Sequence, residues 1–193
     1  MKYFVGGVNG VGKSYFLNKV KESKPDYDVI DGARAFMKWL GFDDDYERLR
    51  KLHPDIRDSR LSEFISQTLN KSQSETLIYA GHFLVLVRGE IYRGTREWLA
   101  RFDGIALLKA SPETILERIA EDNRDRALFK EDVTREDAIK ILKDYNLKEN
   151  VEFLALAEKY GLPSLLINNS RGRVENTVAE FLEFDAKVRR SYL

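Results

Sequence analysis

Residues 7–14 read Gly7-Val8-Asn9-Gly10-Val11-Gly12-Lys13-Ser14, which matches the pattern G-x-x-x-x-G-K-[ST] in full. The pattern follows an apolar, strand-like run at residues 3–5 and precedes a helical pattern that starts at Tyr15. In such a strand–loop–helix unit, backbone N–H groups of the loop converge on phosphate oxygens, and the positive end of the helix dipole adds to the attraction. The stretch therefore predicts a loop that binds the phosphates of a nucleoside triphosphate.

The polar side chains of this loop have expected roles. Lys13 can reach the β- and γ-phosphates, and the Ser14 hydroxyl can ligate Mg²⁺. We therefore expect ATP and Mg²⁺ as ligands, Lys13 as a catalytic residue and Ser14 as the metal ligand. The residues expected to bind the nucleotide are Gly7, Asn9, Gly10, Val11, Gly12, Lys13, Ser14 and Tyr15. The alternative is a glycine-rich turn with a solvated lysine, and the strand–loop–helix context argues against it.

Composition limits the chemistry that the chain can perform. Its 193 residues suit one α/β domain that buries a sizeable core without cross-links. The absence of cysteine excludes disulfides, thiolate metal sites and cysteine nucleophiles, and two histidines are too few for a histidine-built metal centre. A balance of 32 basic and 32 acidic residues argues against an extended nucleic-acid footprint. Because the sequence shows neither a signal segment nor a membrane-length apolar stretch, we expect a cytoplasmic protein with no membrane partner.

Strand and helix patterns alternate along the whole chain. The strand candidates are residues 3–5, 27–30, 77–80, 104–108 and 165–168. The helix candidates are residues 15–23, 33–40, 46–52, 54–71, 93–101, 112–121, 134–161 and 174–188. The apolar run 83–87 fits either an extended segment or a loop. Several strands are near-continuous apolar runs, which predicts an α/β fold of three layers: a five-stranded parallel sheet flanked by helices, over residues 1–193 as a single domain.

Ligands of a parallel sheet gather at the carboxyl ends of its strands. That edge would bring together the loop after the first strand, Asp31 after the second, Gly81-His82 after the third and Ser111 after the fourth. Ser111 also begins a helix, since it can cap the first turn and is followed by proline. We expect the site at this edge.

A second charged feature lies beyond the fourth strand. Residues 118–126 contain Arg118, Arg124 and Arg126, and arginine forks match phosphate oxygens. Acidic residues are interleaved with them, so the alternative is a solvated, salt-bridged helix end. Because the segment follows a phosphate-binding loop at the place of a kinase lid, we expect these arginines to be catalytic.

These features together resemble the P-loop nucleoside monophosphate kinases, and among them the archaeal-type adenylate kinases. The resemblance covers nearly the whole chain and is carried by the loop of residues 7–14, Gly32, Arg50-Lys51-Leu52-x-Pro54-Asp55, Gly81-His82, Gly89-Glu90-Ile91-Tyr92-Arg93-Gly94 with Trp98, and Arg118 with Arg124-Asp125-Arg126. It implies a helical acceptor-binding segment near residues 32–75, a lid near residues 118–132 and small nucleotide substrates. It also implies transfer of the ATP γ-phosphoryl group to AMP or a related monophosphate.

Two departures from that family concern the acceptor. The third strand ends in Ala80-Gly81-His82, where the family tends to carry an aspartate that helps to orient the Mg²⁺ shell. Conversely, Asp31-Gly32-Ala33-Arg34 resembles the Asp-x-x-Arg of P-loop kinases that act on hydroxyl groups, including polynucleotide kinases.

The nature of the acceptor decides which residues are needed. A monophosphate is already ionised and needs positioning and charge neutralisation, whereas a hydroxyl benefits from a carboxylate that takes its proton. Asp31 can be that catalytic base, and its alternative role is to form the turn before Gly32. The expected acceptor-binding residues are Gly32, Arg34, Arg50 and His82, with Arg57 and Arg60 as further candidates. The alternatives for these residues are solvated helix positions and a structural histidine.

Three functions therefore remain open. The first is an ATP-dependent phosphotransferase of the nucleoside monophosphate kinase type. The second is a P-loop kinase that acts on a hydroxyl of a small metabolite or of a nucleic-acid 5′ end, with Asp31 as base. The third is a nucleotide-binding ATPase or switch protein.

Overall fold

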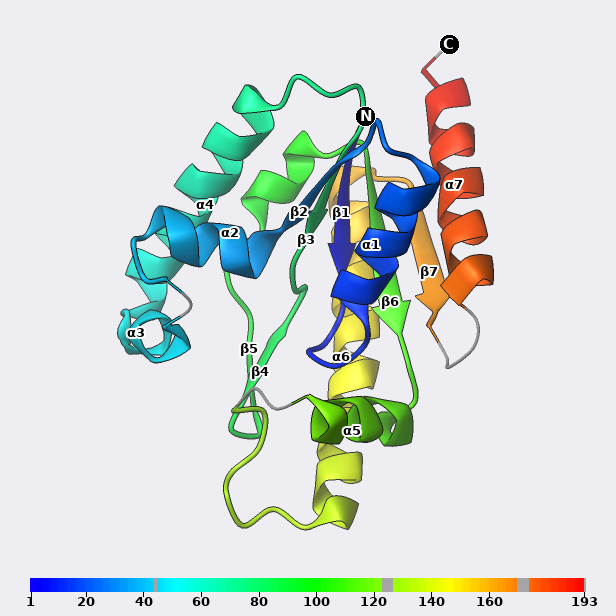
Figure 1. Cartoon of the computed structure of the whole chain (residues 1–193). Helices are drawn as coiled ribbons and strands as arrows, with labels where there is room; N and C mark the ends of the chain where they lie inside the picture. Colours follow the sequence, from blue (N-terminus) through cyan, green and yellow to red (C-terminus); the bar gives the residue numbers. More distant parts are fainter. Residues whose placement is uncertain (44, 123–126, 170–173, 193) are drawn as a thin grey trace.

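The structure is a computed structural model that describes residues 1–43, 45–122, 127–169 and 174–192 (Figure 1). Within these residues, the strands of the main sheet are β1 (Lys2–Gly6), β2 (Asp28–Asp31), β3 (Leu77–Ala80), β6 (Gly104–Lys109) and β7 (Ser164–Asn168). Two further strands, β4 (Val85–Val87) and β5 (Glu90–Tyr92), form an antiparallel pair. The helices are α1 (Lys13–Ser23), α2 (Gly32–Trp39), α3 (Tyr46–Lys51), α4 (Pro54–Lys71), the 3₁₀ helix η1 (Glu97–Arg101), α5 (Pro112–Glu121), α6 (Arg135–Tyr160) and α7 (Val174–Arg190).

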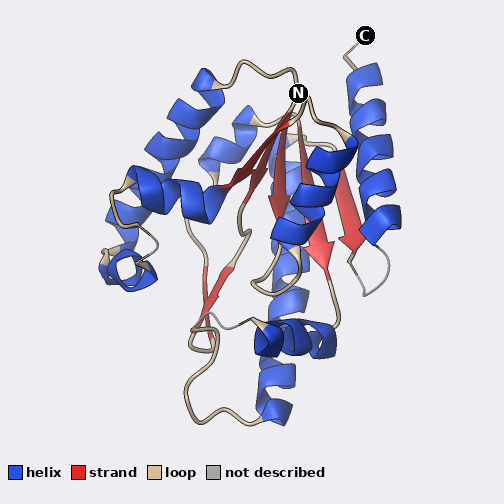
Figure 2. Cartoon of the chain, viewed as in Figure 1, coloured by secondary structure: helices blue, strands red, loops and turns tan. Residues whose placement is uncertain are grey.

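The main sheet is parallel throughout, with strand order β2-β3-β1-β6-β7. Strands β1, β3 and β6 are almost wholly buried, as apolar strands in a sheet covered on both faces should be. Figure 2 shows helices in front of the sheet and behind it. The predicted α/β fold with a five-stranded parallel sheet is confirmed. Because all strands end at one edge, the loops after β1, β2 and β3 open toward the same region.

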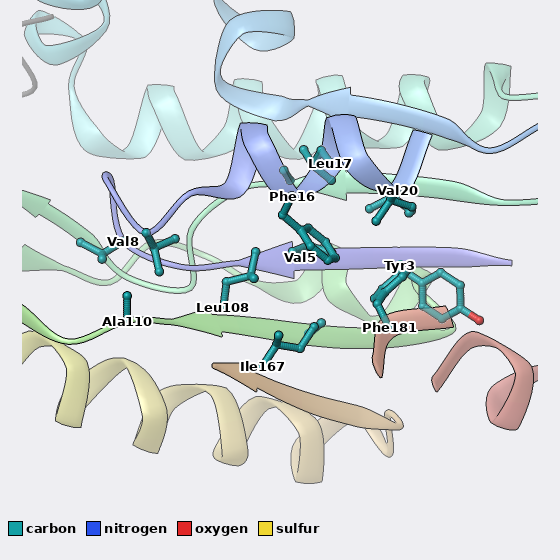
Figure 3. Packing of buried hydrophobic residues seen from close by; sticks show 14 of the residues in the cluster. Tyr3, Val5, Val8, Phe16, Leu17, Val20, Leu108, Ala110, Ile167 and Phe181 are labelled. Carbon is teal, nitrogen blue, oxygen red and sulfur yellow. The ribbon is translucent and has the colours of Figure 1, made fainter. Parts of the chain in front are cut away.

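Alternate side chains of β1 enter the two cores that lie on opposite faces of the sheet. Tyr3 packs edge-on against Phe181 of α7, with ring centroids 5.5 Å apart, and Phe181 packs against Phe16 of α1 (Figure 3). Phe4 points the other way and lies 5.0 Å from the Trp98 ring of η1. The central strand therefore fixes the phosphate-binding loop that follows it between two packed layers.

The helix ends follow from local sequence. The Ser111 hydroxyl accepts the Thr114 N–H at 3.1 Å, and the Thr134 hydroxyl accepts the Asp137 N–H at 3.2 Å. Gly161 closes α6 in the left-handed conformation, with φ of 61°. The starts of α5 and α6 and the end of α6 are thus where capping chemistry predicts them. None of the described helices combines the length and the apolar character needed to cross a membrane.

The run 83–87 is resolved as the start of a hairpin. Arg88 and Gly89 both have positive φ, 50° and 81°, which is the backbone of a two-residue hairpin turn. Such turns match the right-handed twist of the two strands that they join, here β4 and β5. The sequence gives little warning of this turn because arginine rarely adopts positive φ.

The segment 93–101 contains less helix than its pattern predicted, since only Glu97–Arg101 is helical. The Thr95 N–H donates to the Asp58 carboxylate of α4 at 2.8 Å, and the Arg96 guanidinium donates to the Phe83 carbonyl. Residues before η1 therefore make tertiary contacts in place of helical hydrogen bonds.

Candidate active site

The phosphate-binding loop joins β1 to α1, as the sequence predicted. Gly10 and Gly12 have φ of 84° and 98°, a conformation that side chains with a Cβ rarely adopt. Space is also limited at Gly12, where a Cβ would lie 2.6 Å from the Asn169 amide nitrogen. The two glycines are therefore required by the shape of the loop and by what packs against it.

Lys13 lies against the loop to which it belongs. Its ammonium donates to the Gly7 carbonyl at 2.5 Å and to the Val8 carbonyl at 3.0 Å. The side chain also lines the cavity that opens above the loop. Lys13 is thus placed where phosphate oxygens of a bound nucleotide would compete with these carbonyls for its protons.

Arg118 and Asn169 hold the loop from its other side. Arg118, on α5, donates to the Val11 carbonyl at 2.6 Å and to the Asn169 carbonyl at 2.9 Å. The Asn169 side chain, just after β7, donates to the same Val11 carbonyl at 2.7 Å. Arg118 also lines the cavity, so one arginine both fixes the loop and faces the ligand space.

Asp31 lies beside Ser14. The Ser14 hydroxyl donates to Asp31 Oδ2 at 3.5 Å, while Asp31 Oδ1 accepts the Arg34 N–H at 3.3 Å and caps α2. The alternative expected for Asp31 was to form the turn before Gly32, and here the residue caps α2 while its other carboxylate oxygen faces the loop. Burial and the charge of Asp31 together raise the pKa of Tyr79, whose side chain lies on β3.

The register of the sheet relates Asp31 to the missing aspartate of the third strand. Asp31 and Ala80 are paired residues of the neighbouring strands β2 and β3. Asp31 therefore places a carboxylate at the same edge of the sheet as Ala80, on the neighbouring strand. A hydroxyl and a carboxylate are oxygen ligands of the kind that Mg²⁺ takes in kinases, together with phosphate oxygens. Among the described residues, no group of three or more histidine or acidic side chains is arranged to hold a metal ion. The Ser14 hydroxyl would hold Mg²⁺ together with phosphate oxygens of the nucleotide.

A cavity of about 320 Å³ lies at this edge of the sheet. Its lining residues are Asn9, Gly10, Gly12, Lys13, Ser14, Tyr15, Leu17, Asp31, Ala33, Tyr46, Ala80, Gly81, His82, Arg118 and Asp122. The loop, Asp31 and Gly81-His82 meet there as the topology predicts. Ser111 is not among the lining residues, and its side chain caps α5.

Some expected site residues lie elsewhere. Gly7 and Val11 belong to the loop but are buried and do not line the cavity, and Gly32 is buried at the start of α2, where a Cβ would collide with the Ala80 carbonyl. The Arg34 side chain is exposed and is not among the lining residues, and Arg50 donates to Glu47 of its own helix at 3.0 Å.

Of the remaining basic candidates, Arg60 is paired with Glu63 and Arg57 is half-buried on α4. Arg124 and Arg126 lie outside the described residues. Sequence reasoning missed Tyr46, Asp122 and Asn169. For Asn169 a signal existed, since it directly follows the fifth strand of the sheet.

Comparison with known proteins agrees with this geometry. A family model described as an AAA domain matches residues 6–135, about two thirds of the chain. A search among curated proteins finds no match.

Two similar solved structures are shikimate kinases. The enzyme from Bacteroides thetaiotaomicron has a TM-score of 0.63 and 15% identity, covering 95% of this chain and 97% of that one. The enzyme from Acinetobacter baumannii, in complex with shikimate, has a TM-score of 0.62 and 14% identity, covering 96% and 93%. At this identity the likeness concerns the fold, which is that of a small P-loop kinase. The family match shows more: the chain belongs to the AAA domain family.

Proposed function

We propose that this chain is an ATP-dependent phosphotransferase that transfers the γ-phosphoryl group of ATP to a hydroxyl group of a small molecule. The observation that carries this is the place of Asp31. Its Oδ2 faces Ser14 at 3.5 Å, its Oδ1 is held by the first turn of α2, and the residue lines the cavity. A carboxylate fixed beside the phosphate-binding loop is suited to accept the proton of an attacking hydroxyl.

The donor side of the cavity is built for a triphosphate. The loop amides and Lys13 would hold the phosphate oxygens, and Ser14 would hold Mg²⁺. When bound, Mg²⁺ supplies positive charge that neutralises the phosphates. Arg118 stabilises the negative charge that develops on the transferring group, because it faces the same cavity from α5.

The acceptor side favours a hydroxyl over a monophosphate. The cationic side chains among the described lining residues are Lys13 and Arg118, and both lie against the phosphate-binding loop. Arg34 and Arg50, expected to bind an acceptor phosphate, do not line the cavity. The lining residues outside the phosphate-binding loop, α1 and the α5 segment are Asp31, Ala33, Tyr46, Ala80, Gly81 and His82, and we call them the acceptor wall. The similar structure that contains shikimate also supports a small-molecule acceptor.

In the proposed reaction the acceptor oxygen attacks the γ-phosphorus while the bond from that phosphorus to the bridging oxygen of ADP breaks. The hydroxyl proton passes to Asp31, and ADP leaves with the electron pair of the broken bond. Lys13 and the loop N–H groups hold the phosphate charge throughout. His82 lies on the acceptor wall, where it can orient the hydroxyl.

A nucleoside monophosphate kinase is the second candidate. It is favoured by the resemblance in sequence and by Tyr46, the first residue of α3, which brings the segment 32–75 to the cavity. For this reaction Arg34 or Arg50 would have to reach the acceptor phosphate. A nucleotide-binding ATPase or switch protein is the third candidate, and it needs no acceptor.

The test is an ATP-consumption screen with AMP, other monophosphates, small hydroxy acids and polyols, nucleosides and 5′-hydroxyl oligonucleotides. It uses the wild type and Asp31→Asn. Asparagine is as good a helix cap as aspartate, so this substitution removes the base and keeps the start of α2. With a hydroxyl acceptor we expect kcat to fall on the order of a hundredfold or more. Asp45→Asn, which changes the cap of α3 in the same way, is the matched control and should retain activity.

Two outcomes would contradict the hydroxyl kinase. Turnover of AMP that survives Asp31→Asn would favour the second candidate. ATP hydrolysis that no acceptor stimulates would favour the third candidate and exclude both kinases.

A further inference from the structure

A buried polar pair lies on α6, on the side of that helix that faces the sheet. Tyr145 is fully buried, and Glu149 is 3% exposed. The Tyr145 hydroxyl lies 2.6 Å from the Leu84 carbonyl and 2.8 Å from Glu149 Oε1, and the Leu84 backbone also hydrogen-bonds the Glu149 carboxyl. An ionised carboxylate at this depth is destabilising unless charge and hydrogen bonds compensate it. The reaction described above makes no use of this pair.

The pair fastens a segment that forms part of the cavity wall. Leu84 follows Gly81 and His82, which line the cavity, by only a few residues. Arg96 fastens the same segment from another side, since its guanidinium donates to the Phe83 carbonyl at 3.0 and 3.2 Å. The backbone after β3 is thus held by buried side chains of α6 and of the loop before η1. A shift at Leu84 would move His82 relative to the phosphate-binding loop.

The single hydroxyl proton of Tyr145 has two possible acceptors. A tyrosine hydroxyl has a single hydrogen, so Tyr145 donates either to Leu84 or to Glu149. Both short contacts are satisfied together only when Glu149 carries a proton and donates it to the Tyr145 oxygen, while Tyr145 donates to Leu84. With the neutral carboxyl, Tyr145 is therefore free to donate to the Leu84 carbonyl, whereas the carboxylate competes for the same hydroxyl proton.

The charged surroundings connect Glu149 to the nucleotide site. Burial raises the pKa of Glu149 to about 7, against the opposing effects of Tyr145, of the Lys13 charge from α1, of the Leu84 backbone and of Lys109 from β6. Tyr145 is neutral, because burial and Glu149 raise its own pKa, and Arg96 opposes that rise. A polyphosphate that engages Lys13 would neutralise the cation that favours the carboxylate, and it would add negative charge nearby. Nucleotide binding should therefore drive a proton onto Glu149.

We propose that Glu149 is a positioning residue that takes up a proton when a polyphosphate binds at Lys13, and that the protonated side chain, through Tyr145, fixes Leu84 and hence the acceptor wall at Gly81-His82. The second half of this proposal, the positioning of the acceptor wall, rests on the proposed kinase function. The first half, the uptake of a proton by Glu149, requires only that a nucleotide binds. Occupation of the donor site thereby rigidifies the acceptor site.

Proton uptake can be measured without knowing the acceptor. ADP with Mg²⁺ is titrated calorimetrically into wild type and into Glu149→Gln near pH 7, in buffers of different ionisation enthalpy. Glutamine resembles the neutral carboxyl in size and charge. Because burial raises the pKa of Glu149 to about 7, the wild type should take up a measurable fraction of a proton more per nucleotide than the variant. Equal uptake by the two proteins would overturn the proposal.

A second measurement covers the case in which Glu149→Gln does not fold. For the wild type, the ADP affinity should fall severalfold as the pH rises from about 6 to about 8, because the bound state holds the extra proton. Tyr145→Phe, which leaves the carboxyl in place, should keep a pH dependence of the same sign. An affinity that is constant over this range in both proteins would overturn the proposal.

The positioning role is tested with Tyr145→Phe and a matched control, Tyr3→Phe. Each substitution removes one fully buried tyrosine hydroxyl that lies within hydrogen-bond distance of a carboxylate. The Tyr3 hydroxyl contacts Asp185, in the core between the sheet and helices α1 and α7. We expect both variants to lose stability. Tyr145→Phe alone should also lower kcat and raise the acceptor KM, on the order of tenfold in their ratio, with little change in ADP affinity.

Equal kinetics for the two tyrosine variants would overturn the positioning role. If no acceptor is phosphorylated by the wild type, the kinase function fails, while the difference in proton uptake between wild type and Glu149→Gln still decides the first half. The two failures are thus distinguishable.

Discussion

The substitution Asp185→Ala should remove the central partner of a buried polar cluster that ties α7 to the sheet. Asp185 is 4% exposed, and its carboxylate accepts the Tyr3 and Tyr27 hydroxyls, each at 2.6 Å. The Arg189 Nε donates to both carboxylate oxygens, at 2.9 and 3.1 Å, and the same guanidinium bonds Thr76 just before β3. The Asp185 carboxylate thus connects α7 to β1 and to the segment before β2, and its partner Arg189 extends the cluster to the segment before β3.

The expected loss follows from the donors that alanine would leave without an acceptor. Each of the two buried tyrosine hydroxyls loses a hydrogen bond, at about 1.5 kcal/mol apiece. Arg189 contributes about 1 kcal/mol, because its side chain is 35% exposed and water can replace part of the interaction. We therefore expect the free energy of unfolding to fall by about 4 kcal/mol. For a chain of this size that corresponds to a drop in Tm of about 12 °C.

The assay is urea denaturation followed by far-ultraviolet circular dichroism, with the free energy extrapolated linearly to water. The matched control is Asp144→Ala, which removes a carboxylate from the exposed pair with Lys148 and should change stability by less than about 0.5 kcal/mol. A loss below about 1.5 kcal/mol for Asp185→Ala would show that the hydroxyls and the guanidinium find other partners, which would refute the reasoning.

Four further predictions concern pH and the site. Hydrogen bonds from Tyr27, Tyr3 and Arg189 outweigh burial and lower the pKa of Asp185 in the folded protein. The stability that the ionised Asp185 contributes should therefore be fully present above the pKa of this group in the unfolded chain, and be lost as the pH falls through the lower folded value. Asp185→Asn should flatten this part of an acid denaturation curve. Lys13→Ala should abolish ATP turnover, and full activity in that variant would contradict the assigned phosphate-binding loop. Asn169→Ala should weaken ADP binding measured by calorimetry on the order of tenfold, because the Val11 carbonyl loses one of its two side-chain donors. Gly12→Ala should destabilise the fold by about 1–2 kcal/mol in thermal denaturation, since its φ is 98°; an unchanged Tm would show that the loop relaxes.

Elements with local signals were predictable from the sequence. Ser111 and Thr134 begin helices through contacts within three residues, and apolar runs such as residues 104–108 are typical of strands buried on both faces. The phosphate-binding loop depends on its own glycines. These features need no information from distant parts of the chain, and the structure contains all of them.

Features that depend on contacts between distant residues could not be predicted in this way. The pairing of Asp31 with Ala80 comes from sheet register, so the sequence showed a missing carboxylate and not its neighbour. Glu149 occupies an ordinary position in a charged helix pattern, and only the packing of α6 shows that it is buried.

The tip of the β4–β5 hairpin is attached to the chain beyond α5 by two backbone hydrogen bonds. The Arg88 N–H donates to the Ala127 carbonyl, and the Gly89 N–H donates to the Leu128 carbonyl, both at 2.7 Å. Hydrogen bonds of this kind do not depend on which side chains the four residues carry. Proline at position 88 or 89 would remove one of the two donors and so open the attachment. Other substitutions keep the N–H groups, but the positive φ of Gly89 (81°) and the burial of Leu128 limit which side chains these positions accept.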